Sequence, residues 1–230
     1  MFDEVKGKKF TDFKKVRAMI EELTDKVAGT NQGIVDKPIV LHIYSFTCPD
    51  LTLIDLPGIT RIPIKGSDQR VDIEKVTKEM ALRYVGDVRT IILCVIPANA
   101  DITTSDALQM ARKIDPKGIR TLGVITKIDI MDAGTNAKKM IMGQEVPLRL
   151  GYVGVKNRSQ QDIIDDKGVK AALKEEQDYF SNHPVYQTMP QNMLGCHQLT
   201  TKATKIMFTH IKSHLPDIMR EIKDKITEID

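Results

Sequence analysis

Apolar positions recur along this chain with two periods, which predict a mixture of helices and strands. Between residues 10 and 28 they follow helical spacing, and Gly29 stands where such a helix would end. Helical spacing returns over 71–86, 104–114, 167–180 and about 190–229. We therefore expect five helices, with the longest at the C-terminal end.

Two alternating runs near the N-terminal end predict a β-hairpin. Residues 39–46 and 51–56 have the period of strands, and Cys48–Asp50 between them reads as a turn.

Three later apolar runs predict a parallel sheet. Residues 90–96 and 121–125 read as buried parallel strands, and 152–155 as a short strand. Strands separated by helices are typical of an α/β fold with a mostly parallel sheet flanked by helices.

Composition narrows the class of protein. The chain is 41% hydrophobic and 28% charged, as in ordinary globular proteins. Its 34 basic residues are interspersed with 31 acidic ones, so the net charge of +3 indicates no nucleic-acid partner. The three cysteines show neither metal nor disulfide spacing, and no apolar run is long enough to cross a bilayer. We expect a cytoplasmic protein with reduced thiols.

Ligands of open α/β sheets bind outside the carboxyl ends of the strands, so the loops after each strand are the candidates for a site. The first is Asp55–Gly58. Asp55 can hold Mg²⁺ through water, and the backbone N–H of Gly58 can approach a terminal phosphate. A lone Asp-x-x-Gly is more often only a strand-ending turn.

The second loop is Thr126–Asp129. The Asp129 carboxylate can accept hydrogen bonds from N1–H and N2–H₂ of guanine, a pair of donors that adenine lacks. The apolar stem of Lys127 can lie across the base or ribose. The alternative is a solvated charged turn.

The third loop is Asn157–Gln160, which reads as a base- and ribose-side loop only beside the second one. It also contains an Asn-x-Ser acceptor for glycosylation, but nothing in the sequence indicates secretion. Together the three loops favour a guanine nucleotide, GTP or GDP.

Several motifs resemble the dynamin superfamily of large GTPases, and the resemblance runs almost from end to end. It implies a GTP-hydrolysing, Mg²⁺-dependent protein that self-associates through its GTPase domains and remodels membranes, lying in the cytoplasm at their periphery. The motifs are KGKKFTDF at 6–13, GTN at 29–31, DLPGIT at 55–60, PANAD at 97–101, GVITKID at 123–129 and NRSQ at 157–160.

The resemblance also implies roles for single residues. Asp55 and Gly58 would belong to the switch that senses the terminal phosphate, with Asp55 holding Mg²⁺ indirectly. Asp101 would lie on a loop between paired GTPase domains, although a solvated aspartate is an equal alternative. The residues that would bind the nucleotide are Thr126, Lys127, Asp129, Asp132, Asn157, Arg158 and Gln160.

One expected motif is not found: the 230 residues contain no G-x-x-x-x-G-K-[ST]. By the resemblance, the phosphate loop, the switch I threonine and the first strand would precede Met1. We expect either a gap in the sheet or direct pairing of the 51–56 and 90–96 strands, and little GTP hydrolysis by these residues alone.

The expected organisation is a partial GTPase domain over 1–193, followed over 194–230 by a helix that Pro216 kinks. By the resemblance, this helix leads toward a helical bundle. Two alternatives remain open: a non-catalytic fragment that acts by assembly, and an incomplete gene product.

Overall fold

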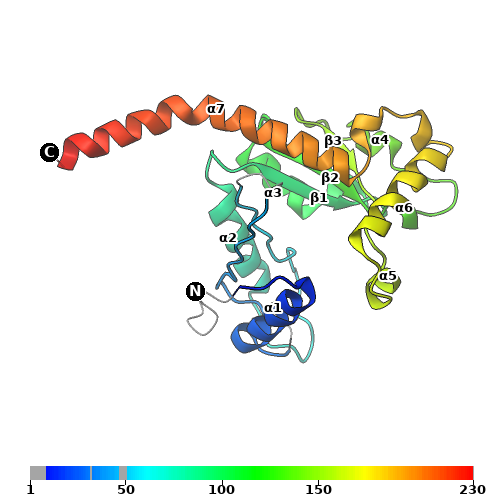
Figure 1. Ribbon diagram of the computed structural model, residues 1–230, viewed down its shortest axis with the longest axis horizontal. Coiled ribbons are helices and arrows are strands. Elements are labelled where there is room, and N and C mark those ends of the chain that lie inside the picture. The colour runs from blue at the N-terminus through cyan, green and yellow to red at the C-terminus, as the bar shows by residue number, and fades with distance from the viewer. Residues whose placement is uncertain (1–8, 32, 47–50, 230) are drawn as a thin grey trace. The chain divides into compact units, whose positions relative to one another are not determined.

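The computed structural model describes residues 9–31, 33–46 and 51–229 (Figure 1). The chain divides into two compact units, Met1–Tyr84 and Val85–Asp230. Each unit is described by itself.

The first unit contains two helices, α1 (Phe13–Ala28) and α2 (Ile73–Val85), the second of which ends at the boundary. Helix α1 begins after Asp12, whose carboxylate accepts the N–H of Lys14 at 2.9 Å. It ends at Gly29, whose φ of 79° suits a residue without a Cβ. Both helices were predicted, with starts two or three residues earlier.

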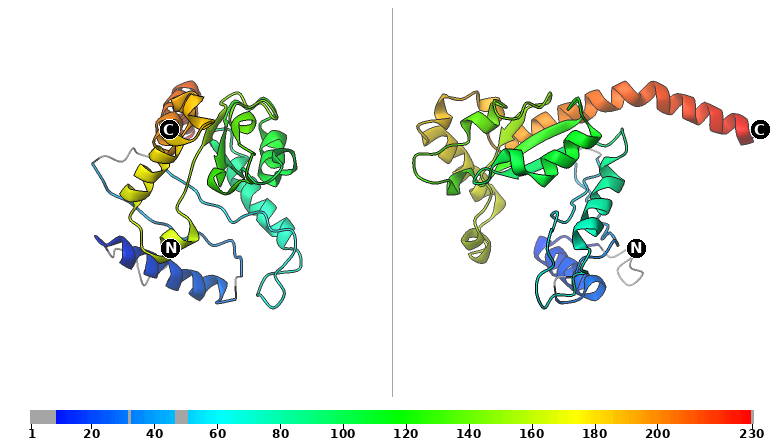
Figure 2. Two further views of the ribbon diagram at one scale, coloured as in Figure 1. Left: turned by 90° about the vertical axis from the view of Figure 1, so that its right-hand side faces the viewer. Right: turned by 180° about the vertical axis from the view of Figure 1, so that it is seen from behind.

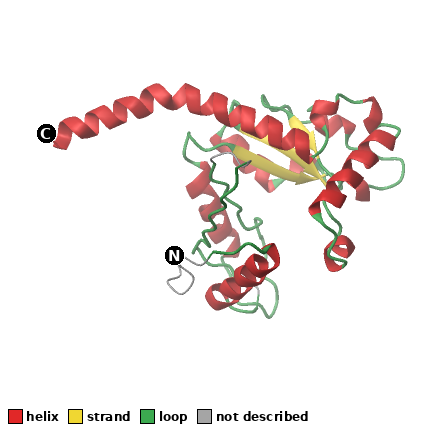
Figure 3. Cartoon of the chain, viewed as in Figure 1, coloured by secondary structure: helices red, strands yellow, loops and turns green. Residues whose placement is uncertain are grey.

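The predicted hairpin of the first unit is wrong. The described parts of 39–46 and 51–56 contain no strand, and Figure 3 draws them as loop. Most of their apolar side chains are exposed, for example Tyr44 by 90% and Leu53 by 74%. A two-stranded ribbon is marginal in water unless another element pairs with it or covers its apolar face, and alternation alone supplies neither. The expected turn at 48–50 lies outside the described residues.

The second unit is built on a parallel sheet. Its strands are β1 (Ile92–Pro97), β2 (Thr121–Thr126) and β3 (Tyr152–Gly154), in the order β1-β2-β3. This confirms the α/β class and the parallel pairing. Since the described sheet has three strands, direct pairing of residues 51–56 with β1 is not seen.

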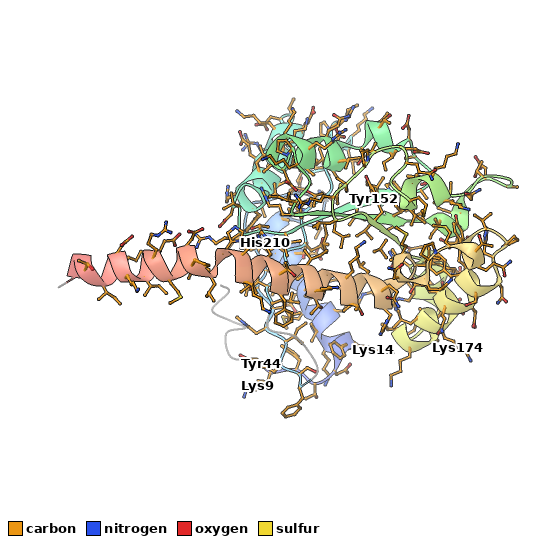
Figure 4. The ribbon with its side chains drawn as sticks, turned by 90° about the horizontal axis from the view of Figure 1, so that it is seen from above. Lys9, Lys14, Tyr44, Tyr152, Lys174 and His210 are labelled. Carbon is orange, nitrogen blue, oxygen red and sulfur yellow. The ribbon has the colours of Figure 1, made fainter. Side chains whose placement is uncertain are left out.

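One face of the sheet is covered by short and medium helices. They are α3 (Asp106–Ile114), α4 (Lys138–Ile141) and α6 (Val169–Asn182). Tyr152 is buried on this face, where Figure 4 labels it, and its hydroxyl donates to the Val146 carbonyl at 2.7 Å. Its ring lies against Gly123, where a Cβ would come within 2.0 Å of the ring. Only glycine fits at that position of β2.

The opposite face is covered by the first half of α7 (Cys196–Ile229) (Figure 2). Leu199, Ala203 and Ile206 pack there on apolar side chains of β2 and β3. On β1, however, Leu93 and Val95 remain 38% and 54% exposed. The prediction that this strand is buried is therefore wrong for one face, because α7 packs on β2 and β3 but not on β1.

Helix α7 continues through Pro216 without interruption and bends along its course (Figure 1). Nε2 of His210, labelled in Figure 4, lies 3.1 Å from the Val88 carbonyl oxygen. Arg89 forms an exposed ion pair with Glu221 at 3.3 Å. Exposed pairs of this kind contribute about 0–1 kcal/mol, so packing of the first half holds the helix.

A buried carboxylate fixes the connection from α3 to β2. Asp115 accepts hydrogen bonds from the N–H groups of Ile119 and Arg120, both at 3.0 Å, and from the Thr121 hydroxyl at 2.7 Å. Burial by itself raises the pKa of Asp115, but these donors outweigh it and the pKa lies below its usual value. The ionised form is therefore favoured in the folded protein.

Replacing Asp115 with asparagine should destabilise the protein by about 1–3 kcal/mol at pH 7, because the amide places donors beside donors. A lowered pKa contributes stability above the unfolded value of about 3.9, which is lost as pH falls below it. The difference between wild type and Asp115→Asn should therefore shrink below about pH 4. Urea unfolding followed by circular dichroism measures it, with the exposed Asp224→Asn as control. An equal difference at pH 7 and pH 3 would contradict this account.

Candidate functional site

Three loops leave the sheet at one edge, because the strands are parallel. The Ala98 N–H donates to the Thr126 carbonyl at 2.8 Å, and the Val155 N–H donates to the Ile125 carbonyl at 2.8 Å. These bonds continue the sheet to the last residue of β2. The structure therefore brings the segments 98–101, 127–132 and 155–160 to the carboxyl edge of the same sheet.

The loop after β2 has an unusual backbone. Lys127 adopts left-handed angles, φ 57° and ψ 31°, which cost a non-glycine residue about 1–3 kcal/mol. Ile128 is buried in the core, whereas Lys127 and Asp129 are exposed on either side of it. The turn thus anchors its middle residue and leaves both charged side chains available to a ligand.

Helix α6 and the segment after it hold this loop and the segment that follows it through hydrogen bonds. The Tyr179 hydroxyl donates to the Ile128 carbonyl at 3.1 Å, and the Ala137 N–H donates to the Tyr186 hydroxyl at 2.9 Å. Burial, then the neighbouring Tyr186 and the Asp129 charge, raise the pKa of Tyr179 to about 12. Tyr179 therefore keeps its proton and remains a donor. Asp132, farther along the same segment, is exposed.

The loop after β3 is closed by a helix that was not predicted, α5 (Gln160–Ile164). Ser159 caps it: its hydroxyl accepts the Asp162 N–H at 3.1 Å, and the Asp162 carboxylate accepts the Ser159 N–H at 2.8 Å. Arg158 donates to the Lys167 carbonyl at 2.9 Å. Asn157 and Gln160 are exposed at this edge.

An ion-pair network continues from α5 to α6. The Lys167 ammonium lies between the carboxylates of Asp162 and Glu175, at 2.8 Å from the latter. Its hydrogen bond holds the pKa of Asp162 well below the usual range, and the pKa of Lys167 is raised in turn. The network therefore remains charged at neutral pH and ties the third loop to α6.

Glu176 contacts the segment that leads into the third loop, and the sequence did not single it out. It is 3% exposed, and its carboxylate accepts the N–H of Lys156 and that of Cys196, both at 2.8 Å. The Cys196 sulfur lies 3.2 Å from the same carboxylate. A charged residue in an amphipathic helix is ordinarily placed on its solvent face. The available signal was the position of Glu176, one helical turn before the buried Phe180.

Asp101, on the loop after β1, has a local partner. Its carboxylate accepts the hydroxyl of Thr103 at 2.7 Å and the N–H of Thr103 at 2.8 Å, and these bonds lower its pKa. It thereby caps the short helix Ile102–Thr104 and remains exposed.

Asp55 and Gly58 belong to the first unit, so the structure does not group them with these loops. Both are exposed, and a Cβ at Gly58 would meet nothing within 4 Å. The described residues hold no group of three or more His, Cys, Asp or Glu side chains suited to a metal. Mg²⁺ usually keeps several waters in its shell, so the exposed carboxylate of Asp55 is compatible with holding the ion through water.

The contact between Glu176 and Cys196 predicts the reactivity of the thiol. Burial, the Glu176 charge and its hydrogen bond raise the pKa of Cys196 to about 12. Glu176→Gln removes the charge, so the pKa should fall and alkylation by iodoacetamide at pH 8 should accelerate. Peptide mass spectrometry measures the rate at each cysteine.

Cys94 serves as an internal control for this prediction, because burial alone raises its pKa to about 12. Unfolding would accelerate alkylation of both thiols, whereas the local effect accelerates only Cys196. The exposed Asp178→Asn, on the same helix, should change neither rate. An unchanged Cys196 rate in Glu176→Gln would contradict the prediction.

Two family models match this chain, one over its N-terminal residues and one over its C-terminal residues. The model described as "Dynamin family" matches residues 1–128, and the one described as "Dynamin central region" matches residues 136–230. Among the described residues, no helix has the length and apolar character needed to cross a membrane.

Three curated relatives show the extent of the similarity. The chain is 44% identical to Dynamin-2 of Mus musculus over 229 residues, 100% of this chain and 26% of that protein. It is 45% identical over 227 residues to the dynamin-related protein dnm1 of Schizosaccharomyces pombe, covering 99% of this chain and 29% of the relative. It is 44% identical to Dynamin-A of Dictyostelium discoideum over 220 residues, which is 96% of this chain and 25% of that protein.

The chain thus spans about a quarter of the length of these relatives. The first family match covers more than half of its residues and includes Asp55, Gly58, Asp101 and Thr126–Ile128. The similarity extends over the loops after β1, β2 and β3. This chain belongs to the dynamin family.

Proposed function

We propose that this chain supplies the guanine-recognition part of a dynamin-type GTPase. The observation that carries the proposal is the Lys127 turn, which exposes Lys127 and Asp129 at the sheet edge beside Asn157–Gln160. Asp129 would accept N1–H and N2–H₂ of guanine, and the Lys127 stem would cover the base. Thr126, Asp132, Asn157, Arg158 and Gln160 would complete the pocket.

The remaining roles follow from family membership. Asp55 and Gly58 would sense the terminal phosphate, with Mg²⁺ held through water by Asp55 and supplying charge neutralisation when bound with GTP. Asp101 would contact a second GTPase domain. Residues 1–193 would form part of the GTPase domain and 194–230 its connecting helix. Membrane remodelling, in the cytoplasm at the membrane periphery, would belong to the whole protein.

These 230 residues should bind the nucleoside rather than the phosphates. The sequence contains no G-x-x-x-x-G-K-[ST] loop to hold the β- and γ-phosphates. Guanosine should therefore bind with a dissociation constant on the order of 1 mM. GTP with Mg²⁺ should bind only slightly more tightly than guanosine, and GTP hydrolysis should stay close to the uncatalysed rate. Amide chemical shifts followed during titrations measure both affinities.

Asp129→Asn tests the role of the carboxylate. The variant should lose guanosine affinity by about tenfold or more. It should gain affinity for xanthosine, whose C2 carbonyl can accept a hydrogen bond from the new amide. Asp224→Asn, at the exposed distal part of α7, is the matched control. Equal binding of guanosine and adenosine by the wild type would refute the proposal, and micromolar binding of GTP would refute the expected weakness.

A second candidate function is assembly through α7 without catalysis. From residue 208 onward this helix exposes six large apolar side chains at helical spacing, which is the signature of an unoccupied packing face. They are Phe208, Ile211, Leu215, Met219, Ile222 and Ile226, here called the α7 stripe.

The α7 stripe predicts self-association that depends on concentration. Leu215→Glu with Ile222→Glu should shift the protein toward monomer in sedimentation velocity, because these residues are 48% and 54% exposed at its centre. Lys212→Gln with Lys223→Gln changes the net charge equally and should leave association intact. A stripe variant that associates like the wild type would exclude this face as the interface.

A further inference from the structure

The Glu176 carboxylate joins two segments that are 40 residues apart in the sequence. Its Oε1 accepts the Lys156 N–H at 2.8 Å, and its Oε2 accepts the Cys196 N–H at 2.8 Å. Lys156 immediately precedes the Asn157–Gln160 loop, and Cys196 is the first residue of α7. One side chain of α6 therefore holds the start of a candidate nucleotide loop and the start of the longest helix.

The Glu176 carboxylate is buried, and the partners that the structure gives it are two backbone N–H groups and the Cys196 thiol. Removing an ionised carboxylate from water is strongly unfavourable unless donors replace the lost hydration. Moving either Lys156 or Cys196 would leave the carboxylate short of a donor, so the positions of the two segments depend on each other.

Other bonds hold the same segments and make Glu176 suitable for mutation. The Gly195 N–H donates to the Gly154 carbonyl at 2.8 Å, and Leu194 forms a bridge with Gly154. The first half of α7 also packs on β2 and β3. A variant that loses the carboxylate therefore keeps the contacts that attach α7 to the sheet.

We propose that Glu176 is a positioning residue for the bound nucleoside. It fixes the Asn157–Gln160 loop through the Lys156 N–H and makes the position of that loop depend on the first turn of α7. The inference rests on the proposed guanine-nucleotide function. It assigns to α6 a second support of the pocket, next to the contact of Tyr179 with Ile128 on the same helix.

The wild-type chain gives the first test, through amide hydrogen exchange measured with and without saturating guanosine. Guanosine should slow exchange at the N–H groups of both Lys156 and Cys196. Ordering the loop holds the Glu176 carboxylate in place, so the hydrogen bonds that it accepts from both groups open less often. Adenosine at the same concentration should slow neither. Protection of Lys156 with unchanged exchange at Cys196 would overturn the link to α7.

Glu176→Gln gives the second test, in the same nucleoside titrations. In the wild type Oε1 and Oε2 each accept one backbone N–H, and in glutamine one of these positions becomes an NH₂ donor that faces an N–H. Guanosine affinity should therefore fall by about tenfold. Exchange at Lys156 and Cys196 should accelerate, and xanthosine should gain nothing, in contrast to Asp129→Asn. Asp178→Asn, exposed on the same helix, should match the wild type.

The outcomes separate the two proposals. A wild type that binds no guanosine refutes the proposed function, and the inference falls with it. A wild type that binds guanosine while Glu176→Gln binds equally well refutes the positioning role alone. If Glu176→Gln does not fold, as judged by circular dichroism, the exchange pattern of the wild type decides.

Discussion

The hydrogen bonds that β2 makes to both of its neighbours are the constraint on which the second unit depends. They align β1, β2 and β3 in one direction, so the chain leaves all three strands at one edge. The fit of Tyr152 against Gly123 fixes the spacing of β2 and β3 on one face. Helix α7 covers the other face of these two strands. The candidate site is therefore a consequence of parallel pairing.

Helix α6 then decides how the loops are held at that edge. Tyr179 and Glu176 stand three residues apart on it, and each accounts for one loop. Tyr179 bonds the carbonyl of the buried residue between Lys127 and Asp129, which helps to keep the left-handed turn. The Glu176 carboxylate accepts a hydrogen bond from the N–H of Lys156, the residue before Asn157. Contacts to the backbone of a loop do not occupy side chains such as those of Lys127 and Asp129, which favours recognition with little reorganisation.

The two units differ in how far local pattern matched the structure. In the second unit, each predicted strand also had a neighbour to pair with and a helix to cover it, and the parallel sheet formed. In the first unit, residues 39–46 and 51–56 carry an alternation that is also typical of strands, but no described element pairs with them. Strand formation requires partners for backbone groups, and the alternation of side chains does not report whether a partner exists. Helices satisfy their own backbone, which explains why α1, α2, α3, α6 and α7 were all predictable.

The sequence by itself determined the α/β class, the long helices and the polar loops that follow the strands, because these depend on local spacing and on residue type. Tertiary structure decided which strands pair, which face of β1 stays exposed, and that Glu176 is buried between Lys156 and Cys196. The physical reason is that burial and hydrogen-bond partnership are properties of residues distant along the chain. A glutamate in an amphipathic helix has the same local signature whether it faces water or holds two backbone N–H groups in the interior.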